Sequence, residues 1–186
     1  MTFVRRVPRA AALVLWPVVV PLVFAGIPIA LSYAGTRYGW HGGRPGGWNL
    51  AGIVPLAGGA ALIAWVLAAH YRAAPAEGWE LGRGMGPAYK PPYLLRDGPY
   101  ARSRHPLYVG EQAVLLGWAV LLGSVAVAIL LVVAVLGQRT LAPWEEHRLE
   151  AQFGEAYRDY RAEVPRWFGR GFLSPHPSES GPPGRR

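Results

Sequence analysis

The chain of 186 residues is 52% hydrophobic and only 16% charged, whereas a soluble domain usually carries about 25% charged residues. It contains no cysteine, which excludes disulfides, thiolate nucleophiles and cysteine-ligated metal sites. The net charge of +8 is concentrated beside long apolar runs, so it indicates membrane orientation rather than binding to nucleic acid.

The apolar residues form four runs, each of which predicts a transmembrane helix: 10–33, 50–71, 107–122 and 125–136. The first two reach the ~20 residues that a helix needs to cross the hydrocarbon core. The first run is also longer than the apolar part of a secretory signal, so we expect it to be retained. The last two runs together would extend roughly 45 Å as one helix, which favours a tight helical hairpin that turns at Gly123-Ser124.

Basic residues predict the orientation of these helices. Arg5, Arg6 and Arg9 precede the first run, and more basic residues lie between the second and third runs and after the fourth. The loop between the first and second runs holds only Arg37 and Arg44. By the positive-inside rule, both termini and segment 72–97 face the cytoplasm. We therefore expect an integral protein of the bacterial inner (plasma) membrane.

The segments outside the runs complete the expected fold. Segment 72–97 is rich in glycine and proline, which forbids a long helix and suits a loop in the headgroup region or over a site. Residues 145–164 predict a C-terminal amphipathic helix, because apolar residues recur there at steps of three and four. These are Leu149, Phe153, Tyr157, Tyr160 and Val164.

The expected fold class is an all-α integral membrane protein with about four transmembrane helices, the last two a hairpin, followed by that amphipathic helix. We divide it into residues 1–94, with the first two helices and the cytoplasmic loop, and residues 95–170, with the motifs described below. Residues 171–186 form a tail whose proline, serine and glycine content predicts disorder.

Short motifs between residues 95 and 167 point to an activity. Gly98-Pro99-Tyr100 is followed by His105-Pro106-Leu107-Tyr108-Val109-Gly110, and Glu145-Glu146 follow the last apolar run. Phe153-Gly154, Tyr157, Tyr160 and Val164-Pro165-Arg166-Trp167 come next. In this order and spacing they resemble the superfamily of isoprenylcysteine carboxyl methyltransferases and phospholipid methyltransferases, which are integral membrane enzymes.

The resemblance implies an enzyme that uses S-adenosylmethionine (SAM) as its cofactor. In that superfamily the matching residues contribute to SAM binding, so the resemblance implies the same role for His105, Tyr108, Gly110, Glu145 and Glu146. Independently of it, a hairpin brings the start of the third helix beside the end of the fourth, so these residues become neighbours. A glutamate carboxylate can bind ribose hydroxyls or an ammonium group, and the glycine allows close approach of cofactor or backbone.

Three further residues complete the predicted site. Tyr100 can stack on the cofactor or form a hydrogen bond to it, so we include it among the cofactor-binding residues. Arg104 is either a positive-inside anchor or a contact to a substrate headgroup or cofactor carboxylate, and we predict that it is a catalytic residue. Glu111 lies one turn into the membrane, where a carboxylate is costly unless it is paired or hydrated, so we expect it to face the site as a second catalytic residue.

Simpler interpretations remain open for some of these residues. His105 could only cap a helix, and the glutamate pair could be solvated charge. Trp144 and Trp167 are expected as interface anchors. The histidines lack metal-ligand spacing, so we expect no metal.

The expected acceptor is a lipophilic molecule that reaches the site from the membrane lipids. Carboxyl methyltransferases of the superfamily tend to have a basic residue before the Val-Pro pair, whereas Glu163 stands there, which weakens the case for a carboxylate acceptor. Amines, thiols and other lipophilic nucleophiles remain open. The alternative functions are a non-catalytic membrane scaffold of the same fold and a reductase similar to the sterol reductases.

Overall fold

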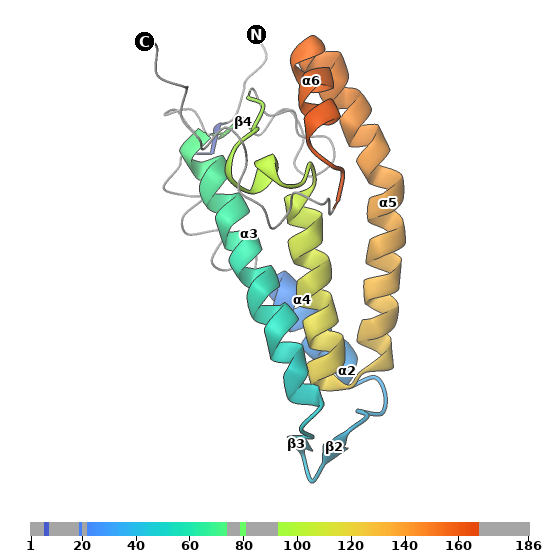
Figure 1. The fold of residues 1–186 in the computed structure, drawn as a ribbon. Coiled ribbons are helices and arrows are strands. Elements are labelled where there is room, and N and C mark those ends of the chain that lie inside the picture. The colour runs from blue at the N-terminus through green and yellow to red at the C-terminus, as the bar shows by residue number, and fades with distance from the viewer. Residues whose placement is uncertain (1–5, 8–18, 20–21, 74–78, 81–92, 168–186) are drawn as a thin grey trace, which may run out of the picture.

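Long helices lying side by side along one axis make up most of the described structure (Figure 1). The computed structural model describes residues 6–7, 19, 22–73, 79–80 and 93–167. The helical elements are η1 (Leu22–Gly26), α2 (Ile27–Ser32), η2 (Asn49–Gly52), α3 (Ile53–Ala73), η5 (Gly98–Ala101), α4 (Pro106–Leu122), α5 (Val125–Phe153) and α6 (Glu155–Glu163).

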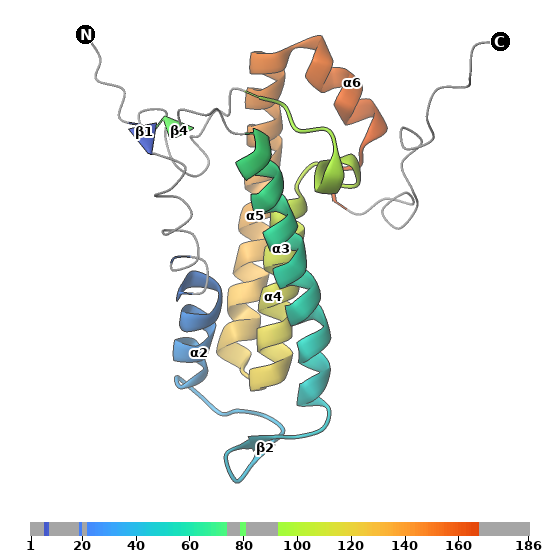
Figure 2. The same ribbon diagram turned by 90° about the vertical axis from the view of Figure 1, so that its left-hand side faces the viewer.

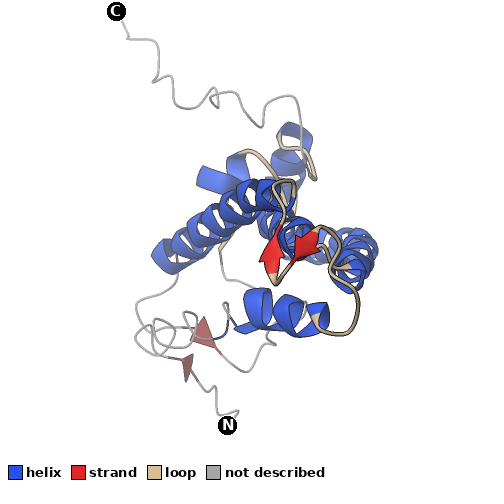
Figure 3. Cartoon of the chain, turned by 90° about the horizontal axis from the view of Figure 1, so that it is seen from below, coloured by secondary structure: helices blue, strands red, loops and turns tan. Residues whose placement is uncertain are grey.

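In the part of the chain that the structure describes, four strands of two residues each form two antiparallel pairs. Strand β1 (Arg6–Val7) pairs with β4 (Trp79–Glu80), and β2 (Trp40–His41) pairs with β3 (Arg44–Pro45). The β2–β3 pair covers one end of the helices, which is the end nearest the viewer in Figure 3. There Trp40 Nε1 donates a hydrogen bond to the carbonyl of Leu121 at 3.0 Å, which ties this loop to the last turn of α4.

Within the described residues, two helical segments are long and apolar enough to cross a membrane by length and composition, Asn49–Ala73 and Val125–Phe153. Segment Leu22–Ser32 and α4 are apolar but shorter. Helix α4 has 17 residues, which rise about 25 Å. A mostly helical chain with these two segments is consistent with a membrane protein, whereas four spans and a transmembrane hairpin stay predictions. Residues 10–18 and 20–21 of the first predicted run lie outside the described residues, as do residues 81–92 and the predicted tail.

Helices α3 and α4 approach each other closely where both carry glycine. A Cβ placed on Gly59 would lie 2.6 Å from the carbonyl oxygen of Gly110 and 2.7 Å from the backbone nitrogen of Val114. A Cβ on Gly110 would lie 2.8 Å from the Cγ1 atom of Ile63. Backbone packs directly on backbone here, a geometry that small residues also allow between helices in membranes.

The boundary of the predicted amphipathic helix is wrong. Helix α5 does not end with the apolar run but continues to Phe153, and only Glu155–Glu163 form the separate helix α6. The chain bends at Gly154, whose φ of 58° is a left-handed value that suits glycine. A helix continues as long as its backbone hydrogen bonds do, so the loss of hydrophobicity after residue 136 did not mark its end.

The apolar face predicted after residue 145 is nevertheless used for packing. Tyr157, Tyr160 and Val164 form one buried cluster, against which Leu149 and Phe153 pack. This cluster packs α6 against the last turns of α5, and Figure 2 shows α6 turning back from the end of α5 at an angle to it. The chain then returns from α6 toward the start of α4 (Figure 1), and this return brings the predicted site residues together.

Candidate functional site

The site lies where the first residues of α4 meet the later part of α5. Ser103 holds the backbone just before α4, since its Oγ accepts a hydrogen bond from the backbone N–H of His105 at 3.2 Å. His105 itself has a non-helical backbone (φ −126°, ψ 56°), and Pro106 opens the helix. Proline suits this first helical position and keeps the preceding residue out of the helix. The His105 side chain is thereby directed toward α5.

Glu146 on α5 is enclosed by three basic side chains. Arg166 donates two hydrogen bonds to it, from Nε to Oε1 and from Nη2 to Oε2, both 2.8 Å long. Arg104 Nη1 lies 3.0 Å from Oε2, and His105 Nε2 lies 3.1 Å from Oε1. Glu146 is only 2% exposed. Its charge is therefore compensated within the protein, and both of its oxygens are occupied.

Glu145, the neighbouring carboxylate, is in a different environment. It accepts a short hydrogen bond of 2.6 Å from the hydroxyl of Tyr108, and its Oε2 lies 3.5 Å from His105 Nδ1. Its side chain is 24% exposed, against 3% for Glu146. The structure thus brings four predicted site residues together, His105, Tyr108, Glu145 and Glu146, and leaves the first carboxylate of the pair open to a ligand.

His105 is the link between the two glutamates, because each of its ring nitrogens faces one of them. Burial by itself lowers the pKa of His105, but its hydrogen bonds to Glu145 and Glu146, together with their negative charges, outweigh burial and raise the pKa above the ordinary 6.5. The ring also stacks on Tyr108, with the two planes 3° apart. The arrangement favours a protonated imidazole between two carboxylates.

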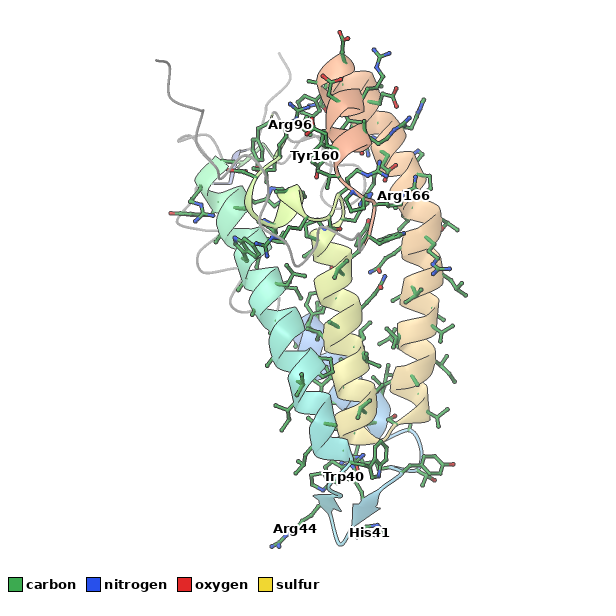
Figure 4. All side chains as sticks on the ribbon, in the orientation of Figure 1. Trp40, His41, Arg44, Arg96, Tyr160 and Arg166 are labelled. Atoms are coloured by element: carbon green, nitrogen blue, oxygen red, sulfur yellow. The ribbon has the colours of Figure 1, made fainter. Side chains whose placement is uncertain are left out.

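Residues 164–167, which we call the strap, close one side of this cluster. The backbone N–H of Arg104 donates to the carbonyl of Pro165 at 3.0 Å, and Ser103 Oγ donates to the carbonyl of Arg166 at 3.1 Å. The Trp167 ring lies 5.4 Å from that of His105, measured between centroids. Figure 4 labels Arg166 where its side chain extends toward α5.

Sequence reasoning missed the contribution of the strap to the site. It included Arg166 and Trp167 in the motif that resembles the superfamily, counted Arg166 among the basic residues after the last run and expected Trp167 at the membrane interface, but it gave neither residue a place in the site. The available signal was the Val-Pro-Arg-Trp sequence directly after an amphipathic helix, but a sequence does not show that this helix folds back.

Arg104 and Tyr100 lie at the edge of the cluster. The Arg104 side chain is only 10% exposed, and its Nη1 atom forms the ion pair with Glu146. Its Nε atom has no hydrogen-bond acceptor within the described part of the chain. Tyr100 belongs to a separate contact, in which its hydroxyl lies 2.7 Å from His70 Nε2 and its carbonyl accepts from the Tyr160 hydroxyl at 2.8 Å. Burial, followed by the charges of Tyr93 and Glu145, raises the pKa of Tyr100.

Gly110 and Glu111 point to different neighbours. Gly110 is buried against α3, and the absence of a side chain lets the backbone of α3 come close. Close approach of either the cofactor or the backbone was expected here, and the structure shows the approach of the backbone. Glu111 faces α5: its Oε2 accepts from Gln138 Nε2 at 2.8 Å, and Gln138 Oε1 accepts from Gln112 Nε2 at 2.7 Å. These three side chains form a polar bridge between α4 and α5.

Beside this bridge lies an apolar groove of about 430 Å³ between α4 and α5. Gln112 is its polar lining residue, and the others are aliphatic. They are Val109, Ala113, Leu116, Leu131, Val132, Val135 and Leu136. The groove therefore joins a hydrocarbon-like surface to the polar bridge.

A family model described as phospholipid methyltransferase matches residues 51–156. This range contains α3, α4, α5 and both glutamates but ends before the strap. No curated protein and no solved structure matches the chain significantly.

Proposed function

Because this chain belongs to the phospholipid methyltransferase family, we propose that it is a membrane methyltransferase that uses SAM and methylates a lipophilic acceptor. Family membership supports a methyltransferase in general and a lipid-type substrate. The cofactor, the acceptor and the residue roles that follow are proposals, argued from the contacts within the site.

The contrast between the two glutamates carries this proposal. SAM is a cation at its sulfonium and its ammonium group, and it carries ribose hydroxyls, so it needs a carboxylate that is open to a ligand. Glu145 meets this need, since its side chain is 24% exposed and a phenol and an imidazole stand beside it. Glu146, at 3% side-chain exposure, is already paired within the protein. We assign Glu145, Tyr108 and His105 to cofactor binding and Glu146 to their support.

When bound, SAM supplies a methyl group on a sulfonium that a nucleophile can attack directly. The protein's task is then to orient both partners and to exclude water. Buried His105 and the ring of Trp167 shield the site from solvent. Arg104 pairs with Glu146 through Nη1, and its buried Nε–H group, which has no acceptor within the described residues, suits the carboxylate of the cofactor.

Glu111 is the residue that we assign to the acceptor. It stands beside the apolar groove, and Gln138 fixes one of its oxygens. A carboxylate here can hold a cationic or proton-bearing head while the groove takes the hydrocarbon part. This negative charge, like that of exposed Glu163, favours an amine or a thiol over a carboxylate acceptor. We propose that transfer takes place at the cytoplasmic face, where SAM is available.

The proposal is tested first by SAM binding to the purified protein in detergent. We expect Glu145→Gln to weaken the affinity by about tenfold to a hundredfold, because a hydrogen bond to a charged group contributes about 1.5–3 kcal/mol. Glu150→Gln is the matched control, since Glu150 lies on the same helix but pairs with Arg161 away from the site. Isothermal titration calorimetry measures both; equal affinities of the two variants would contradict the assignment of Glu145.

A second measurement identifies the acceptor. The protein is incubated with radiolabelled SAM and total membrane extract, and lipid-extractable products are separated by their stability to base. A base-stable product supports an amine or thiol acceptor, whereas a base-labile methyl ester would mean a carboxylate acceptor. SAM binding without transfer to any lipid-extractable product would favour a non-catalytic membrane scaffold.

A further inference from the structure

The strap reaches the candidate site from outside the matched family region, and the Arg166 side chain is its only charged group. Its backbone is attached independently of that side chain. The carbonyls of Pro165 and Arg166 accept hydrogen bonds from Arg104 and Ser103, and Val164 is buried with a relative exposure of 3%. The Arg166 guanidinium is therefore not needed to keep the strap in place.

What the guanidinium does is bind both oxygens of Glu146. Two parallel N–H···O bonds of 2.8 Å fix the plane of the carboxylate, which a single contact would not do. With that plane set, Oε1 is presented to His105 Nε2 at 3.1 Å. The other ring nitrogen, Nδ1, then faces Glu145 at 3.5 Å. A chain of contacts thus leads from Arg166 through Glu146 and His105 to the open carboxylate.

We propose that Arg166 is a positioning residue which acts through Glu146 on His105 and so presents Glu145 and Tyr108 to the cofactor. This inference rests on the proposed function, since it concerns the same site. Arg166 need not touch the cofactor. It gives the two glutamates different roles, because it donates hydrogen bonds to both oxygens of Glu146 and leaves Glu145 available to bind the cofactor.

The charges around His105 show what the loss of Arg166 would change. The groups that face His105 are Glu145 and Glu146 from α5, Tyr108 from α4 and Trp167 from the strap, with Arg104 and Arg166 behind Glu146. Without the charge of Arg166, Glu146 would keep only Arg104 and His105 as partners. The histidine would then be held more strongly by Glu146 and less well placed for Glu145.

The experiment compares Arg166→Gln with Arg166→Lys and with the control Arg161→Gln. Arg161 is an exposed basic residue of α6 that pairs with Glu150 at 3.0 Å. SAM affinity is measured by calorimetry, and the His105 titration is followed by NMR of histidine-labelled protein. We expect Arg166→Gln to weaken SAM binding by about tenfold or more and to move the His105 titration to higher pH. We expect the lysine variant to restore the titration in part and the control to match the wild type.

A double-mutant cycle adds a test that a merely structural strap would not pass. In a Glu146→Gln background the carboxylate is gone, so Arg166→Gln has no partner to act through and should change SAM affinity by less than about twofold, as expected of two strongly coupled residues. An equally large effect in both backgrounds would show that Arg166 does not act through Glu146, and would overturn the proposal.

The remaining outcomes are also decisive. Wild-type SAM affinity and an unshifted His105 titration in Arg166→Gln would overturn the positioning role. Loss of the helical circular dichroism signal in this variant would overturn it too, because Arg166 would then be a folding element. If the wild-type protein binds no SAM, the proposed function fails, while the His105 titration still decides whether Arg166 acts on the histidine.

Discussion

The two faces of α4 differ in how they meet their neighbours. Toward α3, Gly59 and Gly110 let backbone pack on backbone, with no space for a Cβ. Toward α5, Gln112, Gln138 and Glu111 form a polar bridge beside an apolar groove. Close apolar packing cannot rearrange without loss of stability, whereas a groove with a polar edge can admit a ligand. The comparison is consistent with a closely packed α3–α4 pair and with the proposed chemistry between α4 and α5.

The largest expected effect comes from breaking the α3–α4 contact with Gly59→Ala. The new Cβ would lie 2.6 Å from the carbonyl oxygen of Gly110, and the two helices would have to separate. We expect a loss of about 1–3 kcal/mol of stability, as for other overpacked sites, measured as a fall in the thermal unfolding midpoint in detergent.

The control for this variant is the adjacent residue. Gly58 has no neighbour within 4 Å of a built Cβ, so Gly58→Ala should instead stabilise the helix by up to about 1 kcal/mol. Opposite signs at two consecutive glycines would sharpen the comparison. Equal shifts would mean that α3 and α4 are not packed as described.

The next effect concerns the α4–α5 face and should leave the fold intact. Glu111→Gln keeps the size of the side chain but removes its charge. We expect methyl transfer to a lipid acceptor to fall by about tenfold or more, with unchanged SAM affinity and an unchanged unfolding midpoint. The measurement combines radiolabel transfer with calorimetry on the same preparation. A parallel loss of SAM affinity would place Glu111 with the cofactor rather than with the acceptor.

The smallest effect is a pH dependence of stability at the site itself. The pKa of His105 is raised above 6.5 in the folded protein, so the folded state binds the proton more tightly than the unfolded state does. Its contribution to stability is therefore complete below pH 6.5 and is lost as the pH rises through the raised pKa. The difference in unfolding midpoint between wild type and His105→Gln should shrink over that range. A constant difference would show that folding leaves the pKa of His105 unchanged.

Some elements of the fold followed directly from the pattern of residues. Segments 50–71 and 125–136 fall within the two long apolar helices, since a hydrophobic run of this length has few other stable conformations. The meeting of His105 with Glu145 and Glu146 followed from a chain that turns at Gly123-Ser124. The ends of the helices were harder to predict from the sequence, because α5 continues to Phe153, well beyond its apolar part.

Other features required the folded chain. Gly110 was expected near the cofactor or backbone, and only the crossing with α3 shows backbone against it. Arg166 stands 20 residues after Glu146 in the sequence, and nothing in the spacing indicates that α6 returns it to that carboxylate. The separate environment of Tyr100, bonded to His70, depends likewise on how η5 sits on α3.

The sequence by itself therefore determined that the chain is helical and apolar, that it belongs to a methyltransferase family, and that one histidine and two glutamates would be neighbours. These properties depend on local hydrophobicity, on motif spacing and on the direction of two consecutive helices. Only the tertiary structure decided which glutamate is enclosed and which is open. That difference arises because the strap brings Arg166 to Glu146 and not to Glu145, and the partners of a buried charge depend on contacts between segments that are distant in the chain.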